Sequence, residues 1–107
     1  MNTKFVKIAV FVPSTHVDEM RKVLAESGCG HIGNYDSCSF STKGTGRYRG
    51  LEGTKPFIGE TGKLEQIEEE KIETICLFEK YDKVVEVIKK AHPYEEPAID
   101  IYPLLNK

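Results

Sequence analysis

The stretch from His92 to Pro97, with the sequence His-Pro-Tyr-Glu-Glu-Pro, brings together the most varied chemistry in the chain. Within six residues it places an imidazole, a phenol, two carboxylates and two rigid prolines. His92 and Glu95 offer the nitrogen and oxygen ligands that zinc or copper accepts, and His16 is a third candidate ligand. These three residues are the predicted site for a divalent metal. A structural alternative stays open, in which His92 caps the preceding helix, Tyr94 packs, and the prolines fix the turn.

A second group of residues predicts a site for a small anionic ligand. Arg47 and Arg49, with Lys55 nearby, carry positive charge on a stretch that is expected to form a long hairpin. The competing interpretation is that these charges are simply solvated on the hairpin. The predicted ligand-binding residues are Tyr94, Glu96, Arg47, Arg49 and His31.

Cys29 and His31 form the only pairing that suggests nucleophilic catalysis, because a nearby imidazole can lower the pKa of a thiol. Neighbours on a turn rarely align as nucleophile and base, and no third group is placed to orient them. The glycines of residues 28–34 follow a helix and open a strand, whereas a phosphate-binding loop follows a strand and opens a helix. We therefore expect a tight turn here, and we assign no catalytic residue.

The composition indicates a soluble globular protein forming one domain over residues 1–107, with 39% hydrophobic and 30% charged residues. No apolar run approaches the roughly 18 residues that a membrane span needs, and no signal-peptide pattern is visible, so the expected location is the cytoplasm. The net charge of −2 argues against a nucleic-acid partner, and nothing suggests a membrane partner. Three widely spaced cysteines argue against a disulfide framework or a structural zinc site.

Hydrophobic periodicity predicts four strands and two helices. The expected strands are 4–12, 35–51, 63–79 and 98–104, and the expected helices are 15–27 and 81–91. Four local signals accompany them: Thr15 with Asp18 as a helix-capping pair, Asp82 as a second helix cap, Gly28 as a helix stop, and a bulge or bend at Gly44 and Gly46.

The order strand-helix-strand-strand-helix-strand is the ferredoxin-like pattern, an α+β sandwich. A four-stranded antiparallel sheet then carries both helices on one face. The first strand is apolar on both faces, so aromatic residues such as Phe5 and Phe11 would lie in water on the open face of a monomer. We therefore expect a homo-oligomer that uses this open face.

The same topology predicts which loops meet. Residues 14–16, the hairpin 45–62 and the turn 92–97 lie at one end of the sheet, and residues 28–34 lie at the other. His16 and His92 are therefore expected neighbours within a subunit. His31 would meet them only across a subunit interface.

Several motifs resemble the inserted domain of the NGG-one-interacting-factor-three-like family (YqfO type). They are the runs 30–35, 40–46, 51–53, 56–59 and 92–104, in the expected order over nearly the whole chain. The resemblance implies a fold similar to the trimeric CutA and PII signalling proteins, and PII-like trimers bind ligands in clefts between subunits. Full-length members also have a larger body with ligands for two metal ions. Nothing here corresponds to that body, so the expectation is a free-standing copy of the insertion without hydrolase or cyclohydrolase activity.

These observations together predict a non-enzymatic, CutA/PII-like binding or regulatory module for a small ligand or a divalent metal. It would act as a homo-oligomer, with a trimer as the expected state. One alternative is an assembly or protein-partner-binding module without a ligand, and the other is a hydrolase-type enzyme. The sequence requires no cofactor, and zinc or copper is the candidate that its ligands would accept.

Overall fold

The computed structural model describes residues 3–106 and contains the four strands and two helices that the periodicity predicts. The strands are β1 (Phe5–Pro13), β2 (Phe40–Arg49), β3 (Leu64–Leu77) and β4 (Ile99–Leu104). The helices are α1 (Val17–Glu26) and α2 (Tyr81–Ala91), each preceded by a short 3-10 turn. None of the helices within the described residues is long and apolar enough to cross a membrane.

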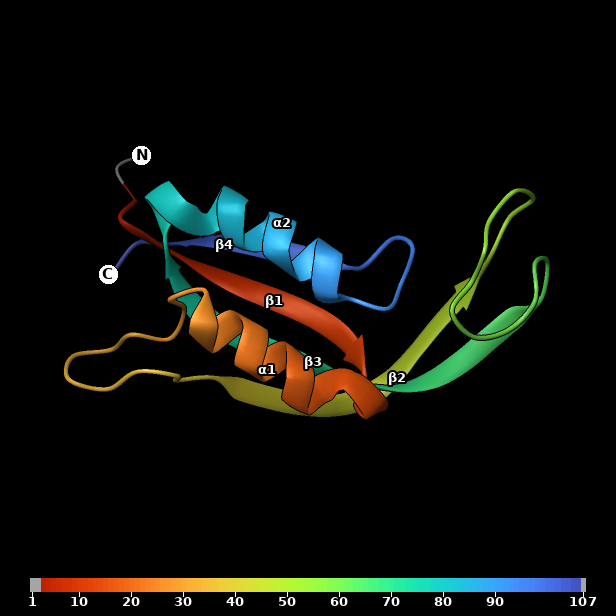
Figure 1. Ribbon diagram of the computed structural model, residues 1–107, viewed down its shortest axis with the longest axis horizontal. Coiled ribbons are helices and arrows are strands. Elements are labelled where there is room, and N and C mark those ends of the chain that lie inside the picture. Colours follow the sequence, from red (N-terminus) through yellow and green to blue (C-terminus); the bar gives the residue numbers. More distant parts are fainter. Residues whose placement is uncertain (1–2, 107) are drawn as a thin grey trace.

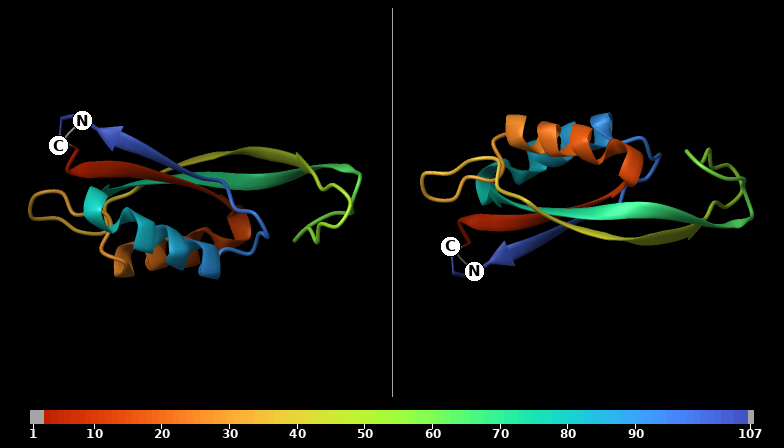
Figure 2. Two further views of the ribbon diagram at one scale, coloured as in Figure 1. Left: turned by 90° about the horizontal axis from the view of Figure 1, so that it is seen from above. Right: turned by 90° about the horizontal axis from the view of Figure 1, so that it is seen from below.

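The strands form one antiparallel sheet in the order β2-β3-β1-β4. Both helices lie against the same face of this sheet, and the opposite face is left open (Figures 1 and 2). The arrangement confirms the ferredoxin-like prediction. Its right-handed crossovers are the reason that α1 and α2 share a face.

The core forms where β1 faces the helices. Side chains alternate along a strand, so Val6, Ile8, Val10 and Val12 all point to this face, and each is at most 2% exposed. The helices complete the same cluster with the residues Val17, Met20, Leu24, Val84 and Ile88. A continuous apolar layer therefore joins the central strand to both helices.

The open face of the sheet carries the alternate residues of β1, including Phe5 and Phe11. Ala9 is fully buried there although no helix covers it, because β3 and β4 flank it on both sides. Apolar side chains on the outer strands stay exposed on this face: Phe40 of β2 is 69% exposed and Tyr102 of β4 is 46% exposed. The register places both on the face opposite the helices.

The predicted helix caps are wrong. Thr15 belongs to a 3-10 turn, and its hydroxyl is hydrogen-bonded to Nδ1 of His16 (2.8 Å) instead of capping α1. Asp82 lies inside α2, where its carboxylate accepts the N–H of Lys83 (2.9 Å). Instead, each helix continues directly from its 3-10 turn. This turn takes over the role of a side-chain cap at the start of the helix. The helix stop at Gly28 is confirmed by its φ of 89°.

Of the bulge or bend predicted at Gly44 and Gly46, the bulge is wrong, because β2 pairs with β3 residue by residue from Phe40 to Arg49. Gly46 has a packing reason instead. A Cβ at this position would collide with the carboxylate of Glu69, which crosses over the glycine from β3.

The second strand also begins later than predicted. Residues 28–39 form a loop whose tip is closed by two hydrogen bonds between the backbones of Ile32 and Tyr35 (3.0 Å each).

The two ends of the molecule differ in shape (Figure 1). At one end, β2 and β3 extend past the helices as a long arm, and the arm's tip, residues 50–63, curls back toward the side of the helices (Figure 2). The turn between α2 and β4 lies at this same end, and the loop 28–39 projects from the opposite end. The predicted separation of His31 from His16 and His92 is therefore confirmed.

We expect Ile8→Ala to lower the free energy of unfolding by about 2–5 kcal/mol, because it leaves a cavity in a fully buried position. The measurement is equilibrium urea unfolding at a fixed protein concentration. Val87→Ala is the matched control, since Val87 on α2 is 43% exposed and its truncation should cost less than about 0.5 kcal/mol. Equal losses in the two variants would contradict this description of the core.

Candidate functional site

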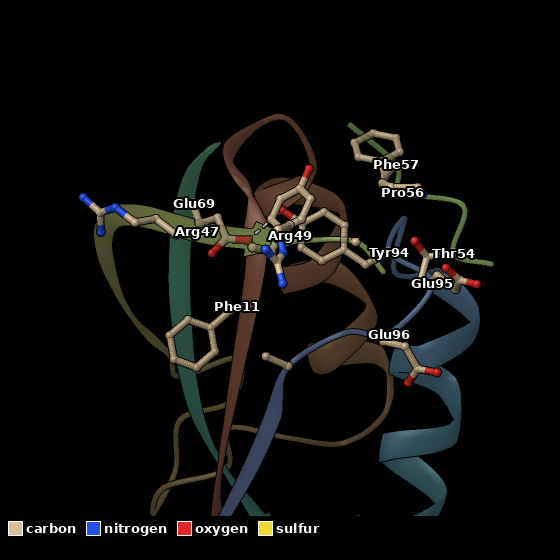
Figure 3. A pocket seen from close by; sticks show the side chains of 14 residues that line it. Phe11, Arg47, Arg49, Thr54, Pro56, Phe57, Glu69, Tyr94, Glu95 and Glu96 are labelled. Carbon is tan, nitrogen blue, oxygen red and sulfur yellow. Dashed lines mark hydrogen bonds between the residues drawn. The ribbon is translucent and has the colours of Figure 1, made fainter. Parts of the chain in front are cut away.

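A cavity of about 410 Å³ opens where the arm, its tip and the turn after α2 come together (Figure 3). Its walls come from segments that are far apart in the sequence: the end of β1, the end of β2, the arm tip, β3, and the turn. The lining residues that carry the argument are Phe11, Tyr48, Arg49, Phe57, Glu69 and Tyr94.

The arm tip is held over this cavity by two kinds of contact. The backbone N–H of Lys55 donates a hydrogen bond to Oε1 of Glu95 (2.9 Å), which ties the tip to the turn. The ring of Phe57 stands edge-on to the ring of His16, with centroids 5.5 Å apart, and lies 6.1 Å from the ring of Tyr94. The tip therefore forms one wall of the cavity.

Tyr94 connects the turn to the sheet. Its hydroxyl donates a hydrogen bond to Oε2 of Glu69 (2.6 Å), and its ring lies 6.4 Å from the ring of Tyr48. Burial, together with the hydrogen bond and charge of Glu69, raises the pKa of Tyr94, so its phenol stays protonated at neutral pH. The Tyr48 hydroxyl donates to the carbonyl oxygen of Ile58 in the tip.

His92 fixes the turn through both of its ring nitrogens. The side chain is 6% exposed, and Nε2 lies 2.7 Å from the carbonyl oxygen of Phe11 in β1. A carbonyl can only accept, so Nε2 carries the proton, and Nδ1 accepts the backbone N–H of Tyr94 (3.1 Å). Burial is the main reason that the pKa of His92 is lowered, so the ring is neutral at pH 7.

This geometry bears on the predicted metal ligands His92, Glu95 and His16. His16 is near His92, and its charge contributes, after burial, to the lowered pKa of His92. Both nitrogens of His92 are already hydrogen-bonded, and Glu95 accepts from Lys55. Over residues 3–106, no group of three or more His, Cys, Asp or Glu side chains is arranged to hold a metal ion.

The predicted ligand-binding residues are divided between two places. Tyr94, Glu96, Arg47 and Arg49 all line the cavity, although the guanidinium of Arg47 points away from the other labelled side chains (Figure 3). His31 is exposed in the loop at the opposite end of the folded molecule. A single copy of the chain therefore cannot bring His31 to the cavity.

Three important lining residues were absent from the predictions. The register pairs Tyr48 with Glu65, and Glu69 comes near Tyr48 only because its carboxylate crosses over Gly46. Phe57 reaches the turn only because the tip folds back. The position of Glu69 inside an acidic run gives no sign of its bond to Tyr94, which is 25 residues away in the sequence. The apolar character of Phe57 in a loop of small and polar residues was the one usable signal.

Cys29 does not form a nucleophile with His31. Its side chain is 1% exposed and lies in the core beside Cys76, while His31 is exposed. Burial raises the pKa of the Cys29 thiol to about 12, so the thiolate that attacks a substrate is scarce at neutral pH.

The stability of the protein should depend on pH through His92. Its folded-state pKa lies below the value of 6.5 for an unfolded chain, so its stabilising effect is complete above pH 6.5 and is lost as the pH falls toward the folded pKa. We expect His92→Gln, which cannot titrate, to lose less stability than the wild type between about pH 7.5 and pH 5. Urea unfolding at both pH values measures this.

The exposed His31 supplies the control, because His31→Gln should keep the pH dependence of the wild type. If the wild type and His92→Gln lose the same stability between the two pH values, His92 is not the neutral, buried group described here.

Comparison with known proteins identifies relatives of this chain, although no family model matches it. A GTP cyclohydrolase 1 type 2 homolog from Halalkalibacterium halodurans is 55% identical over 101 residues, which is 94% of this chain and 27% of the relative. The protein of the same name from Bacillus subtilis is 45% identical over 98 residues, 92% of this chain and 26% of the relative. The chain thus spans about a quarter of the length of these curated relatives.

Solved structures give the same result for the fold. A Bacillus cereus protein related to NIF3 matches with a TM-score of 0.84 and 48% identity, covering 98% of this chain and 27% of that protein. The divalent cation tolerance protein CutA from Archaeoglobus fulgidus matches with a TM-score of 0.69 and 20% identity, covering 94% of this chain and 84% of CutA. The chain is therefore similar to one segment of the NIF3-related GTP cyclohydrolase 1 type 2 homologs, and this segment has the fold of CutA.

Proposed function

We propose that this chain is a non-enzymatic, regulatory module that binds a small ligand in the cavity beneath the arm tip and acts as a homo-oligomer. The cavity itself carries this proposal. Its volume of about 410 Å³ lies in the range of small-molecule sites, and aromatic walls with a few polar groups are the usual lining of such sites.

A regulatory role fits the way in which the cavity is built. The tip closes one wall, and the Lys55–Glu95 hydrogen bond and the packing of Phe57 hold it in place. Both contacts are at the surface, so each contributes only modestly to stability. A ligand between the tip and Tyr94 would therefore shift the tip's position, and the long arm would transmit that change to a partner.

Self-association is supported by the open face of the sheet. Phe40 and Tyr102 are largely exposed there, and no helix covers them. Apolar surface of this kind usually marks an interface. A trimer is the state that we propose, and an assembly module without a ligand is the alternative that this same observation would support.

A divalent metal is the second candidate ligand. The observation in its favour is the likeness to CutA proteins, which are named for divalent cation tolerance. His16, His92 and Glu95 lie at the end of the molecule that holds the cavity. Within residues 3–106, however, they form no three-ligand group. A metal site here would have to be completed by groups from outside this chain.

The ligand proposal predicts that a thermal-shift screen of soluble metabolites, with zinc and copper salts included, will find at least one compound that raises the melting temperature. Tyr94→Ala should abolish that response, because it removes the central wall of the cavity. Val87→Ala is the control, since Val87 lies on α2, away from both the cavity lining and the open face of the sheet. A response unchanged in Tyr94→Ala would place the ligand elsewhere. A response to metal alone that is lost in His16→Ala would favour the metal alternative.

The assembly proposal predicts a mass near three times the 12.1 kDa of one chain in size-exclusion chromatography with light scattering. Phe40→Glu should shift the protein toward monomer, because it places a charge in the open face. Val87→Glu, on the outer surface of α2, should leave the mass unchanged. A monomeric wild type, or equal masses for both variants, would contradict the role of the open face.

A further inference from the structure

We infer that the ligand of this cavity is an organic cation, such as a quaternary ammonium or a protonated amine, and that Tyr94, Tyr48, Phe57 and Glu69 recognise it. This inference rests on the proposed function and specifies its ligand class. It differs from the anionic ligand that the arginines of β2 suggested from the sequence.

The hydroxyl groups of the two tyrosines are already used within the chain. Tyr94 donates to Glu69, and Tyr48 donates to the carbonyl of Ile58. What these residues offer to a ligand is therefore the faces of their rings. The face of an aromatic ring carries partial negative charge, and several rings around one space form the usual site for a quaternary ammonium group.

Of the rings that line this cavity, that of Phe11 already has a cation, whereas those of Tyr48, Phe57 and Tyr94 have none within the described residues. The structure gives two contacts between a lysine and a ring over the described residues, Lys4 over Phe5 and Lys71 over Phe11. Neither involves Tyr48, Phe57 or Tyr94. The centroids of these three rings are 6.1 to 6.4 Å from one another along the pairs Phe57–Tyr94 and Tyr48–Tyr94.

The carboxylates that line the cavity also favour a positively charged ligand. Glu69 is half-buried, and its Oε2 accepts the Tyr94 hydroxyl, but no lysine or arginine of the described chain forms a salt bridge with it. Its charge reaches the rings, because Glu65 and Glu69 contribute, after burial, to the raised pKa of Tyr48. Glu95 and Glu96 add further negative charge to the lining.

The two arginines, Arg47 and Arg49, do not outweigh the negative charge of the lining. The guanidinium of Arg47 points away from the cavity, so only Arg49 brings positive charge to the lining (Figure 3). Arg49 is exposed, and solvent and salt screen an exposed charge. A bare metal ion fits less well than an organic cation, because it needs several ligand atoms within bonding distance, whereas rings and one carboxylate suit a larger, weakly hydrated cation.

The test compares choline with dimethylbutanol, a neutral molecule of nearly the same shape in which carbon replaces the charged nitrogen. Each is titrated into the ¹⁵N-labelled protein, and the amide shifts of Gly46, Tyr48 and Tyr94 are followed. We expect choline to produce saturable shifts at these positions. Dimethylbutanol should bind about tenfold more weakly, because it lacks the charge that the rings and Glu69 attract.

Paired variants separate the contributions that the Tyr94 ring, the Tyr94 hydroxyl and the Glu69 charge make to choline binding. Tyr94→Leu should weaken choline binding about tenfold, whereas Tyr94→Phe, which keeps the ring face, should stay within about threefold of wild type. Glu69→Gln keeps the shape and removes the charge, and it should also weaken binding. Val87→Ala, on α2 and outside the cavity, should have no effect. The dispersion of each variant's spectrum shows whether it is folded.

Two results would overturn the inference and leave the proposed function intact. One is equal affinity for choline and dimethylbutanol, which would make the cavity a simple apolar site. The other is saturable binding of inorganic phosphate with shifts at Arg49, while choline produces none, which would restore the anionic ligand. If neither these probes nor any compound of the thermal-shift screen binds, the proposed function fails together with the inference.

Discussion

The hydrogen bond from His92 Nε2 to the carbonyl of Phe11 is the contact on which the candidate site depends. Phe11 is near the end of the central strand, so this bond fixes where the chain goes after α2. The N–H of Tyr94 then binds Nδ1 of the same ring, which directs Tyr94 back over the sheet toward Glu69. Because the imidazole is buried, loss of either bond would leave a polar group without a partner, at a cost of about 1–3 kcal/mol.

The rest of the site depends on the position of this turn through a series of contacts. Tyr94 in its place gives Phe57 a ring to pack against, and Glu95, one residue further, accepts the N–H of Lys55. The arm tip is thereby placed over the sheet instead of extending into solvent. Residues 92–97 thus act first as a structural connection between α2 and β4, and Tyr48, Phe57 and Glu69 form the binding surface next to them.

Much of the fold could be predicted because it depends on local periodicity. The alternation in residues 4–12 predicted the central strand, and the helical spacing of residues 81–91 predicted α2 with the bounds that the structure gives. The open sheet face and the meeting of His16 with the turn followed from topology. The site was predicted only in part, because Tyr48 and Glu69 depend on strand register, and Phe57 depends on how the tip folds back. Neither property leaves a pattern in the sequence. Arg47 was overweighted because the direction of its guanidinium, which points away from the cavity, cannot be read from the sequence.

His92 is a neutral side chain, hydrogen-bonded to the backbone on both sides, that positions Tyr94 and so shapes the cavity. The most direct measurement is the ring ¹⁵N spectrum of His92 at neutral pH, without and with zinc. We expect a neutral ring with the proton on Nε2 and an unprotonated Nδ1, unchanged when zinc is added. A proton on Nδ1, a charged ring at neutral pH, or a shift of either nitrogen on addition of zinc would contradict it.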